Sequence, residues 1–231
     1  MSETLRASAV IVAAGSGTRM NCEESKQYMM LGDRSVLERT LDVFDECDFI
    51  DEVIVVLPSP DVELWQKRLC DKAKRYKTVG GGSSRTESSY NGIRATSGDN
   101  EIVVIHDGVR PFVTTEQIRS VVAAAHLCGA ATLGMRSKDT VKVVDWESAR
   151  VRSTLNRNEI ALIQTPQAFR LGVIKKAYEI ALKDNLEYFD DCSLVEDMGI
   201  SVKLVEGSPV NIKITVPEDM EMARFLIRRG L

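Results

Sequence analysis

The chain has 231 residues, of which 44% are hydrophobic and 28% are charged, and its formal net charge is −4. This composition is typical of a globular domain with a buried core, and the absence of a basic stripe argues against a nucleic-acid partner. No run of about 18 apolar residues is present that could span a membrane. The five cysteines form no C-x-x-C pair, which argues against a disulfide framework and a cysteine-rich zinc site. We therefore expect a single cytoplasmic domain over residues 1–231 that binds neither nucleic acid nor membrane.

Short apolar runs alternate with helical segments along the chain. Continuous apolar runs predict strands over residues 7–13, 52–57, 101–106 and 130–135. Apolar residues at helical spacing predict helices over residues 35–47, 84–95, 114–128, 170–183 and 217–229. Continuous apolar strands are typical of a parallel sheet that is buried on both faces. The sequence therefore predicts an α/β, Rossmann-like fold, a mostly parallel sheet flanked by helices, with ligands at the carboxyl ends of the strands.

A glycine-containing segment directly follows the first predicted strand. It reads Ala13-Ala14-Gly15-Ser16-Gly17-Thr18-Arg19-Met20, and Lys26 follows shortly after. Glycines let backbone amides approach phosphate oxygens, and the two cations add the charge that a triphosphate needs. The dinucleotide fingerprint requires glycine at the position of Met20, and the Walker loop string is absent. The segment therefore predicts a phosphate-binding loop that belongs to neither of these types.

Two later segments also place polar groups after predicted strands. Gly80 to Arg85, followed by Ser88, is a glycine-rich loop that opens a helix, and the free amides of such a start suit a polar ligand or an anion. Asp107 ends the strand over residues 101–106, where a carboxylate is suited to Mg²⁺, although a turn or helix-cap role is the alternative. His106 is interpreted as a structural hydrogen-bonding residue and not as a base. Asp190 to Ser193 reads as the start of a further helix.

The segment from about residue 138 to residue 162 is predicted to be a protruding β-hairpin arm. Residues 140–144 and 151–155 alternate between polar and apolar, and the stretch between them is polar. A structureless loop of this length would be uncommon. A two-stranded hairpin alone is marginally stable in water, so the apolar residues of the arm require a partner surface. A second copy of the chain is an economical partner, and we expect a homodimer formed through the arm.

The segments AAGSGTRM at residues 13–20 and KQY at residues 26–28 resemble the signature of sugar-phosphate nucleotidylyltransferases. Over nearly the whole chain the motifs resemble, in order, those of the 2-C-methyl-D-erythritol 4-phosphate cytidylyltransferase family. The later motifs are GGGSSR at 80–85, DTVK at 139–142, QTPQ at 164–167 and NIKIT at 211–215. The resemblance implies one nucleotidylyltransferase domain that transfers CMP from CTP to 2-C-methyl-D-erythritol 4-phosphate and releases pyrophosphate, with Mg²⁺ as cofactor.

The resemblance also implies roles for individual residues. Arg19, Lys26 and Lys213 would be catalytic, by stabilising charge on the phosphates. Gly82 and Ser88 would hold the cytosine base, and Asp107 would bind the metal. Thr140, Arg157 and Thr165 would contact the polyol phosphate, with Arg157 reaching the active site of the second subunit. The complete set implied to bind substrate is Ala13, Ala14, Gly15, Gly17, Gly82, Ser88, Asp107, Arg110, Thr140, Arg157 and Thr165.

Some positions depart from the family pattern and leave alternatives open. Gly108 and Val109 stand where the family usually has alanines, and a valine there also occurs in ribitol 5-phosphate cytidylyltransferases, which are the alternative. The DTVK string and the spacing of the QTPQ motif favour methylerythritol phosphate. Phe189 and Cys192 also depart from the usual threonine and alanine. A dinucleotide-dependent oxidoreductase and a non-catalytic nucleotide-binding module are further, less favoured alternatives.

Overall fold

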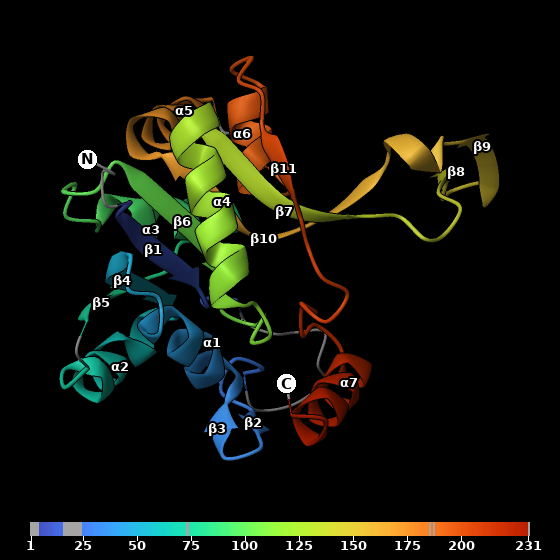
Figure 1. Cartoon of the computed structure of the whole chain (residues 1–231). Coiled ribbons are helices and arrows are strands. Elements are labelled where there is room, and N and C mark those ends of the chain that lie inside the picture. The colour runs from blue at the N-terminus through green and yellow to red at the C-terminus, as the bar shows by residue number, and fades with distance from the viewer. Residues whose placement is uncertain (1–4, 16–24, 73, 185, 187, 231) are drawn as a thin grey trace.

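The computed structural model describes residues 5–15, 25–72, 74–184, 186 and 188–230. In these residues the centre of the molecule is a seven-stranded sheet in the order β11-β7-β10-β6-β1-β4-β5 (Figure 1). The strands are β1 (Ala7–Val12), β4 (Ile50–Leu57), β5 (Arg75–Gly80), β6 (Ile102–Asp107), β7 (Ala130–Arg136), β10 (Ala161–Arg170) and β11 (Lys203–Glu206). Strand β10 runs antiparallel to both of its neighbours, and the other four pairs are parallel. The predicted mostly parallel α/β sheet is confirmed, whereas the antiparallel insertion of β10 was not predicted.

The strands at the centre of the sheet are apolar without alternation because both of their faces are buried. In β1, Ala9 and Ile11 belong to the core cluster on one face and Val10 to the cluster on the other, and all three are fully buried. Strand β6 is likewise buried along its whole length. This arrangement agrees with the general property of parallel sheets that are covered on both sides.

Helices cover the two faces of the sheet (Figure 1). The helices are α1 (Val36–Asp45), α2 (Val62–Leu69), α3 (Arg85–Arg94), α4 (Thr115–Cys128), α5 (Leu171–Lys183), α6 (Asp191–Glu196) and α7 (Pro217–Arg228). Helices α1, α2 and α4 share one core cluster, and α3, α5 and α6 share the cluster on the opposite face. The five helices predicted from apolar spacing are confirmed, with ends within two residues.

Local capping explains where several of these helices begin. The Ser35 and Glu38 side chains each accept a hydrogen bond from the backbone amide of the other residue, which forms a capping box at the start of α1. Ser84 caps α3 by accepting from the amide of Glu87 at 3.1 Å. Such a cap stabilises a helix by about 1 kcal/mol. The Ser84 cap sets the end of the glycine-rich loop and so positions the first turn of α3.

A third, smaller cluster holds the C-terminal part of the chain against the end of the sheet. Helix α7 packs on the short hairpin of β2 (Met30–Leu31) and β3 (Arg34–Ser35), with Leu31 and Met220 almost completely buried between them. Ile214 and Val109 belong to the same cluster. The segment over residues 211–215 is thereby brought next to the carboxyl end of β6.

The predicted arm is present as a hairpin that projects away from the sheet (Figure 1). Strands β8 (Lys142–Asp145) and β9 (Arg150–Thr154) pair antiparallel. The arm exposes large apolar side chains, including Trp146, which is 86% exposed, and Val151. No described helix is both long enough and apolar enough to cross a membrane.

Candidate active site

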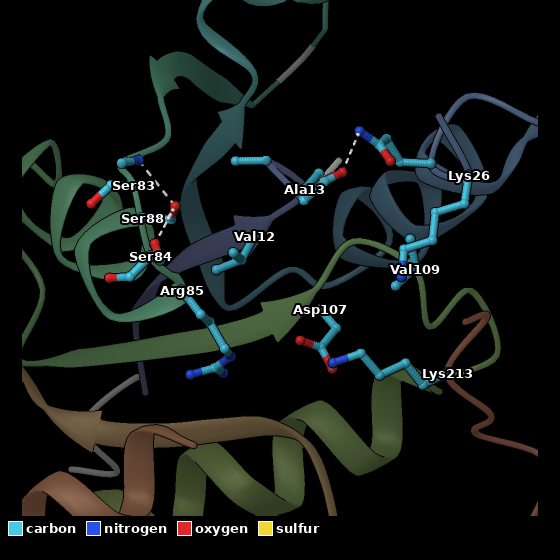
Figure 2. A pocket seen from close by; sticks show the side chains of 14 residues that line it. Val12, Ala13, Lys26, Ser83, Ser84, Arg85, Ser88, Asp107, Val109 and Lys213 are labelled. Atoms are coloured by element: carbon cyan, nitrogen blue, oxygen red, sulfur yellow. Dashed lines mark hydrogen bonds and ion pairs between the residues drawn. The ribbon is translucent and has the colours of Figure 1, made fainter. Parts of the chain in front are cut away.

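A hollow of about 440 Å³ lies at the carboxyl ends of β1 and β6, beside the start of α3 (Figure 2). Strand β1 ends at Val12 and β6 ends at Asp107, and the loop after β5 completes the wall. This is the edge of the sheet at which the sequence predicts ligands. The lining residues are Val12, Ala13, Ala14, Gly15, Lys26, Gln27, Gly82, Ser83, Ser84, Arg85, Ser88, Asp107, Val109 and Lys213.

The structure brings most of the predicted site residues together in this hollow. Eight of them line it: Ala13, Ala14, Gly15, Lys26, Gly82, Ser88, Asp107 and Lys213. Arg110 and Thr165 line an adjoining hollow of about 460 Å³, which shares Arg85, Asp107 and Lys213 with the first. Gly17 and Arg19 lie outside the described residues. Thr140 and Arg157 are exposed on the arm and line neither hollow.

The glycine-rich loop packs closely against the first strand because it lacks side chains. A Cβ atom added to Gly81 would lie 2.3 Å from the Cβ of Ala14, and the Gly81 amide donates to the carbonyl of Leu57 at 2.8 Å. Ser88 closes the loop: its hydroxyl accepts from the Gly82 amide at 3.0 Å and donates to the Ser84 carbonyl at 2.8 Å. Figure 2 shows these serines on the wall opposite Lys26. The polar turn is thus held in place before any ligand binds.

Asp107 is the electrostatic centre of the two hollows. Its Oδ2 atom lies 3.1 Å from Nζ of Lys213 and 3.0 Å from Nε of Arg110. Burial acts to raise the pKa of this carboxyl, but the positive charges of Lys213, Arg110 and Arg85 outweigh burial and hold the pKa well below its usual value. Asp107 is therefore ionised throughout the physiological pH range, and Figure 2 shows its carboxylate and the Lys213 side chain pointing toward each other.

The residues around Asp107 fit a magnesium ion that is shared with phosphates. Among the described residues, no group of three or more His, Cys, Asp or Glu side chains converges to enclose a cation. Mg²⁺ commonly binds through one or two carboxylates and completes its coordination with phosphate oxygens and water. One ionised carboxylate at the wall of a pocket with converging lysines meets that requirement.

His106 precedes Asp107 at the end of β6 and is fully buried. Its Nε2 atom is 3.1 Å from the carbonyl oxygen of Arg110, and its Nδ1 atom is 3.0 Å from the hydroxyl of Thr165. Burial lowers the pKa of His106 to about 4, so the ring is neutral near pH 7. Both ring nitrogens are engaged by protein groups, which agrees with the structural interpretation of this histidine.

Arg85 lines both hollows, although its sequence context predicts no role for it. Its guanidinium makes two hydrogen bonds to the carboxylate of Asp191, at 2.9 and 2.6 Å, and the Tyr178 hydroxyl donates to the same carboxylate. The sequence predicts a helix start at Asp190 to Ser193, and α6 begins at Asp191 with Asp190 as its cap. The arginine of the GGGSSR string was the available signal, but its partner lies far away in the sequence and could not be identified from local pattern.

Comparisons with known proteins agree with this geometry. Residues 7–229 match the family described as 2-C-methyl-D-erythritol 4-phosphate cytidylyltransferase. The chain is 44% identical over 228 residues to the protein of that name from Caldanaerobacter subterraneus, with 97% of this chain and 100% of the relative covered. The corresponding protein of Geobacter metallireducens is 40% identical over 229 residues, with 96% and 98% covered.

Solved structures give the same result. The structure of 4-diphosphocytidyl-2C-methyl-D-erythritol synthase from Anaerococcus prevotii superimposes with a TM-score of 0.87 at 36% identity, and 98% of each chain is covered. Sequence, fold and site geometry therefore lead to one conclusion: this chain belongs to the 2-C-methyl-D-erythritol 4-phosphate cytidylyltransferase family.

Proposed function

We propose that this chain transfers CMP from CTP to 2-C-methyl-D-erythritol 4-phosphate and releases pyrophosphate, as a step in the synthesis of isoprenoid precursors. The observation that carries the proposal is the pair of adjoining hollows that share Asp107 and Lys213. One hollow has the glycine-rich loop and the serine-rich turn, which suit a nucleotide. The other has Arg110 and Thr165, which suit a small phosphorylated polyol. The relatives carry the name of this activity, and the same names do not favour ribitol 5-phosphate.

In the proposed reaction, an oxygen of the polyol phosphate attacks the α-phosphorus of CTP. A new P–O bond forms as the bond to pyrophosphate breaks, and the leaving group takes the electron pair. The protein is asked mainly to align two anions and to stabilise charge on the transferring group. Lys26 and Lys213, which line the nucleotide hollow, are suited to this task. Arg19, outside the described residues, would add a third positive charge.

Each substrate has its own set of proposed contacts. Backbone groups of Ala13, Ala14, Gly15 and Gly17 would approach the triphosphate, and Gly82 with Ser88 would hold the cytosine base. When bound, Mg²⁺ would neutralise phosphate charge, with Asp107 as its protein ligand. Arg110 and Thr165 would bind the phosphate of the polyol, with Thr140 and Arg157 completing that site.

The position of the arm supports a shared active site in a homodimer. Thr140 and Arg157 are exposed on the arm, and η3 (Arg157–Glu159) projects with it from the sheet (Figure 1). The exposed apolar side chains of the arm would be buried against a second copy, and a twofold axis would satisfy both arms by the same contact. We propose that each arm delivers Arg157 to the active site of the other subunit. We also propose that the chain forms a single nucleotidylyltransferase domain and acts in the cytoplasm.

The function is tested by measuring pyrophosphate release with each of the four nucleoside triphosphates against a panel of polyol phosphates, with and without Mg²⁺. Turnover is expected with CTP and 2-C-methyl-D-erythritol 4-phosphate, and only when Mg²⁺ is present. Turnover of ribitol 5-phosphate without turnover of methylerythritol phosphate would refute the proposed substrate. Preference for another nucleotide would refute the nucleotide assignment.

A further inference from the structure

The hollow that Arg110 and Thr165 line, proposed to bind the polyol phosphate, is called the polyol-phosphate hollow. A closed ring of four hydrogen bonds lies behind its wall. His106 bonds to the Thr165 hydroxyl at 3.0 Å, and the Thr165 carbonyl accepts from Nδ2 of Asn211 at 2.9 Å. The Asn211 carbonyl accepts from Nη1 of Arg110 at 2.9 Å, and the Arg110 carbonyl contacts Nε2 of His106 at 3.1 Å. The ring therefore joins the end of β6, strand β10 and the segment over residues 211–215, which are separate in the sequence.

One arrangement of protons satisfies every member of the ring. The Arg110 carbonyl can only accept, so Nε2 of His106 carries the proton and Nδ1 accepts from the Thr165 hydroxyl. The Thr165 oxygen in turn accepts from the backbone amide of Asp107 at 3.0 Å. The amide group of Asn211 is also oriented without ambiguity, because its Nδ2 faces two acceptors, the Thr165 carbonyl and Oε1 of Gln164.

His106 and Asn211 cannot act by touching a ligand, since both are fully buried. Thr165 and Arg110, to which they bond, line the hollow. The Oδ1 atom of Asn211 is buried and has no hydrogen-bond partner among the described residues, and such an atom destabilises the fold. A leucine of similar size would avoid this loss but would also lack the bonds that Nδ2 donates to the Thr165 carbonyl and to Oε1 of Gln164.

We propose that His106 and Asn211 are positioning residues, which set Thr165 and Arg110 in place for the polyol phosphate through this ring. Lys213 is held by the same structure, because it follows Asn211 closely and its neighbour Ile214 donates to the Val109 carbonyl at 2.9 Å. The proposal rests on the proposed function, in which Thr165 and Arg110 bind the polyol phosphate.

The test compares His106→Gln, Asn211→Leu and Thr165→Val, each alone, and the double variant that combines His106→Gln with Thr165→Val. The glutamine amide nitrogen can replace Nε2 at the Arg110 carbonyl but leaves the Thr165 hydroxyl without its partner. The KM for 2-C-methyl-D-erythritol 4-phosphate is expected to rise about tenfold in His106→Gln and Asn211→Leu, while the KM for CTP changes less than about twofold. The double variant is expected to match Thr165→Val, because the bond that the glutamine loses is already absent.

Thr40→Val is the matched control. The Thr40 hydroxyl is buried and contacts the Gly108 carbonyl at 3.1 Å, next to the ring but outside it. This variant should lower the melting temperature without changing the KM for the polyol phosphate. Unchanged KM values in both His106→Gln and Asn211→Leu, or additive effects in the double variant, would overturn the proposal.

Two further measurements keep the test decisive. Calorimetric dissociation constants for the polyol phosphate do not require turnover, so a wild-type chain without activity would refute the proposed function but leave the role of the ring measurable. If His106→Gln does not fold, His106→Asn breaks the ring at its other bond: it keeps an acceptor near Nδ1 for the Thr165 hydroxyl but leaves the Arg110 carbonyl without its donor, and it is expected to raise the same KM. Failure of the variants at both positions to fold would overturn the proposal, because the ring would then serve folding and not positioning.

Discussion

The amide of Ile214 donates to the carbonyl of Val109 at 2.9 Å, and this bond, together with the bond from Arg110 to the Asn211 carbonyl, ties the C-terminal segment to the turn after β6. Lys213 thereby lies 3.1 Å from Asp107, although the two residues are far apart in the sequence. The nucleotide hollow and the polyol-phosphate hollow meet at this ion pair. In the proposed reaction, Asp107 and Lys213 would therefore lie next to the phosphate groups of both substrates.

Replacement of Lys26 or Lys213 by alanine is expected to reduce kcat by a factor on the order of 10²–10³, because each lysine is proposed to stabilise charge that grows in the transition state. Initial rates of pyrophosphate release at saturating substrate give this value. Lys203→Ala, on the exposed surface of β11, serves as the control and should retain wild-type turnover. A Lys26→Ala variant that raised only the KM for CTP would show that Lys26 binds the ground state.

Ser88→Ala is expected to raise the KM for CTP about fivefold, with little change in kcat. The substitution removes the hydroxyl that holds the Gly82 amide and that faces the proposed base site, and one lost hydrogen bond is worth about 1 kcal/mol. Steady-state kinetics with varied CTP provide the measurement. Ser89→Ala is the matched control, since Ser89 is the next residue of α3 and is not among the residues that line the hollow.

Mixing of two inactive variants tests whether the active site is shared between subunits. Arg157→Ala and Lys26→Ala are each expected to be nearly inactive alone. After subunit exchange at equal amounts, half of the dimers contain one of each, and each of these has one intact site, so about one quarter of wild-type activity should return. If no activity returns after verified exchange, the sites are not shared between subunits. If light scattering shows a monomer, the proposal that the arm delivers Arg157 to a second subunit is wrong.

Gly108→Ala is expected to destabilise this chain by about 1–3 kcal/mol and to reduce its activity, because the added methyl group overpacks the end of β1. A Cβ atom at Gly108 would lie 2.8 Å from the Cβ of Ala13, which lines the nucleotide hollow. Chemical denaturation measures the free energy of unfolding. In Gly172→Ala, the control on α5, the new Cβ meets no atom within 4 Å, and unfolding should be unchanged or slightly less favourable.

Stability is expected to fall as the pH rises from about 9 to about 11, in part because of the Cys47 thiol. Burial raises the pKa of Cys47 to about 11. Above the ordinary thiol pKa of 9.0 the unfolded chain loses this proton while the folded chain still retains it, so unfolding becomes more favourable with rising pH. Denaturation curves at several pH values give the free energy of unfolding as a function of pH. This free energy should fall less steeply with rising pH in Cys47→Ala than in wild type. Cys70→Ala, which removes an exposed thiol, should leave the slope unchanged.

Much of the fold could be predicted because its determinants are local in the sequence. Continuous apolar runs predict strands such as Ile102–Asp107, and serine or threonine before an apolar repeat predicts the starts of α1 and α4. The arm was predicted from two alternating runs with a polar turn between them. The order of strands is not encoded locally. The place of β10 between β6 and β7, antiparallel to both, depends on contacts between segments that are far apart in the sequence.

By itself, the sequence determined the kind of fold, the glycine loop, the arm and the short motifs that carry eight of the residues in the nucleotide hollow, since each of these is encoded within a short stretch of chain. The tertiary structure alone decided which side chains meet: Lys213 with Asp107, Arg85 with Asp191, and His106 with Thr165. Such contacts depend on how separate segments pack around a common core, and packing is a property of the whole chain. The charge state of Asp107 and the closed ring behind it follow from that packing.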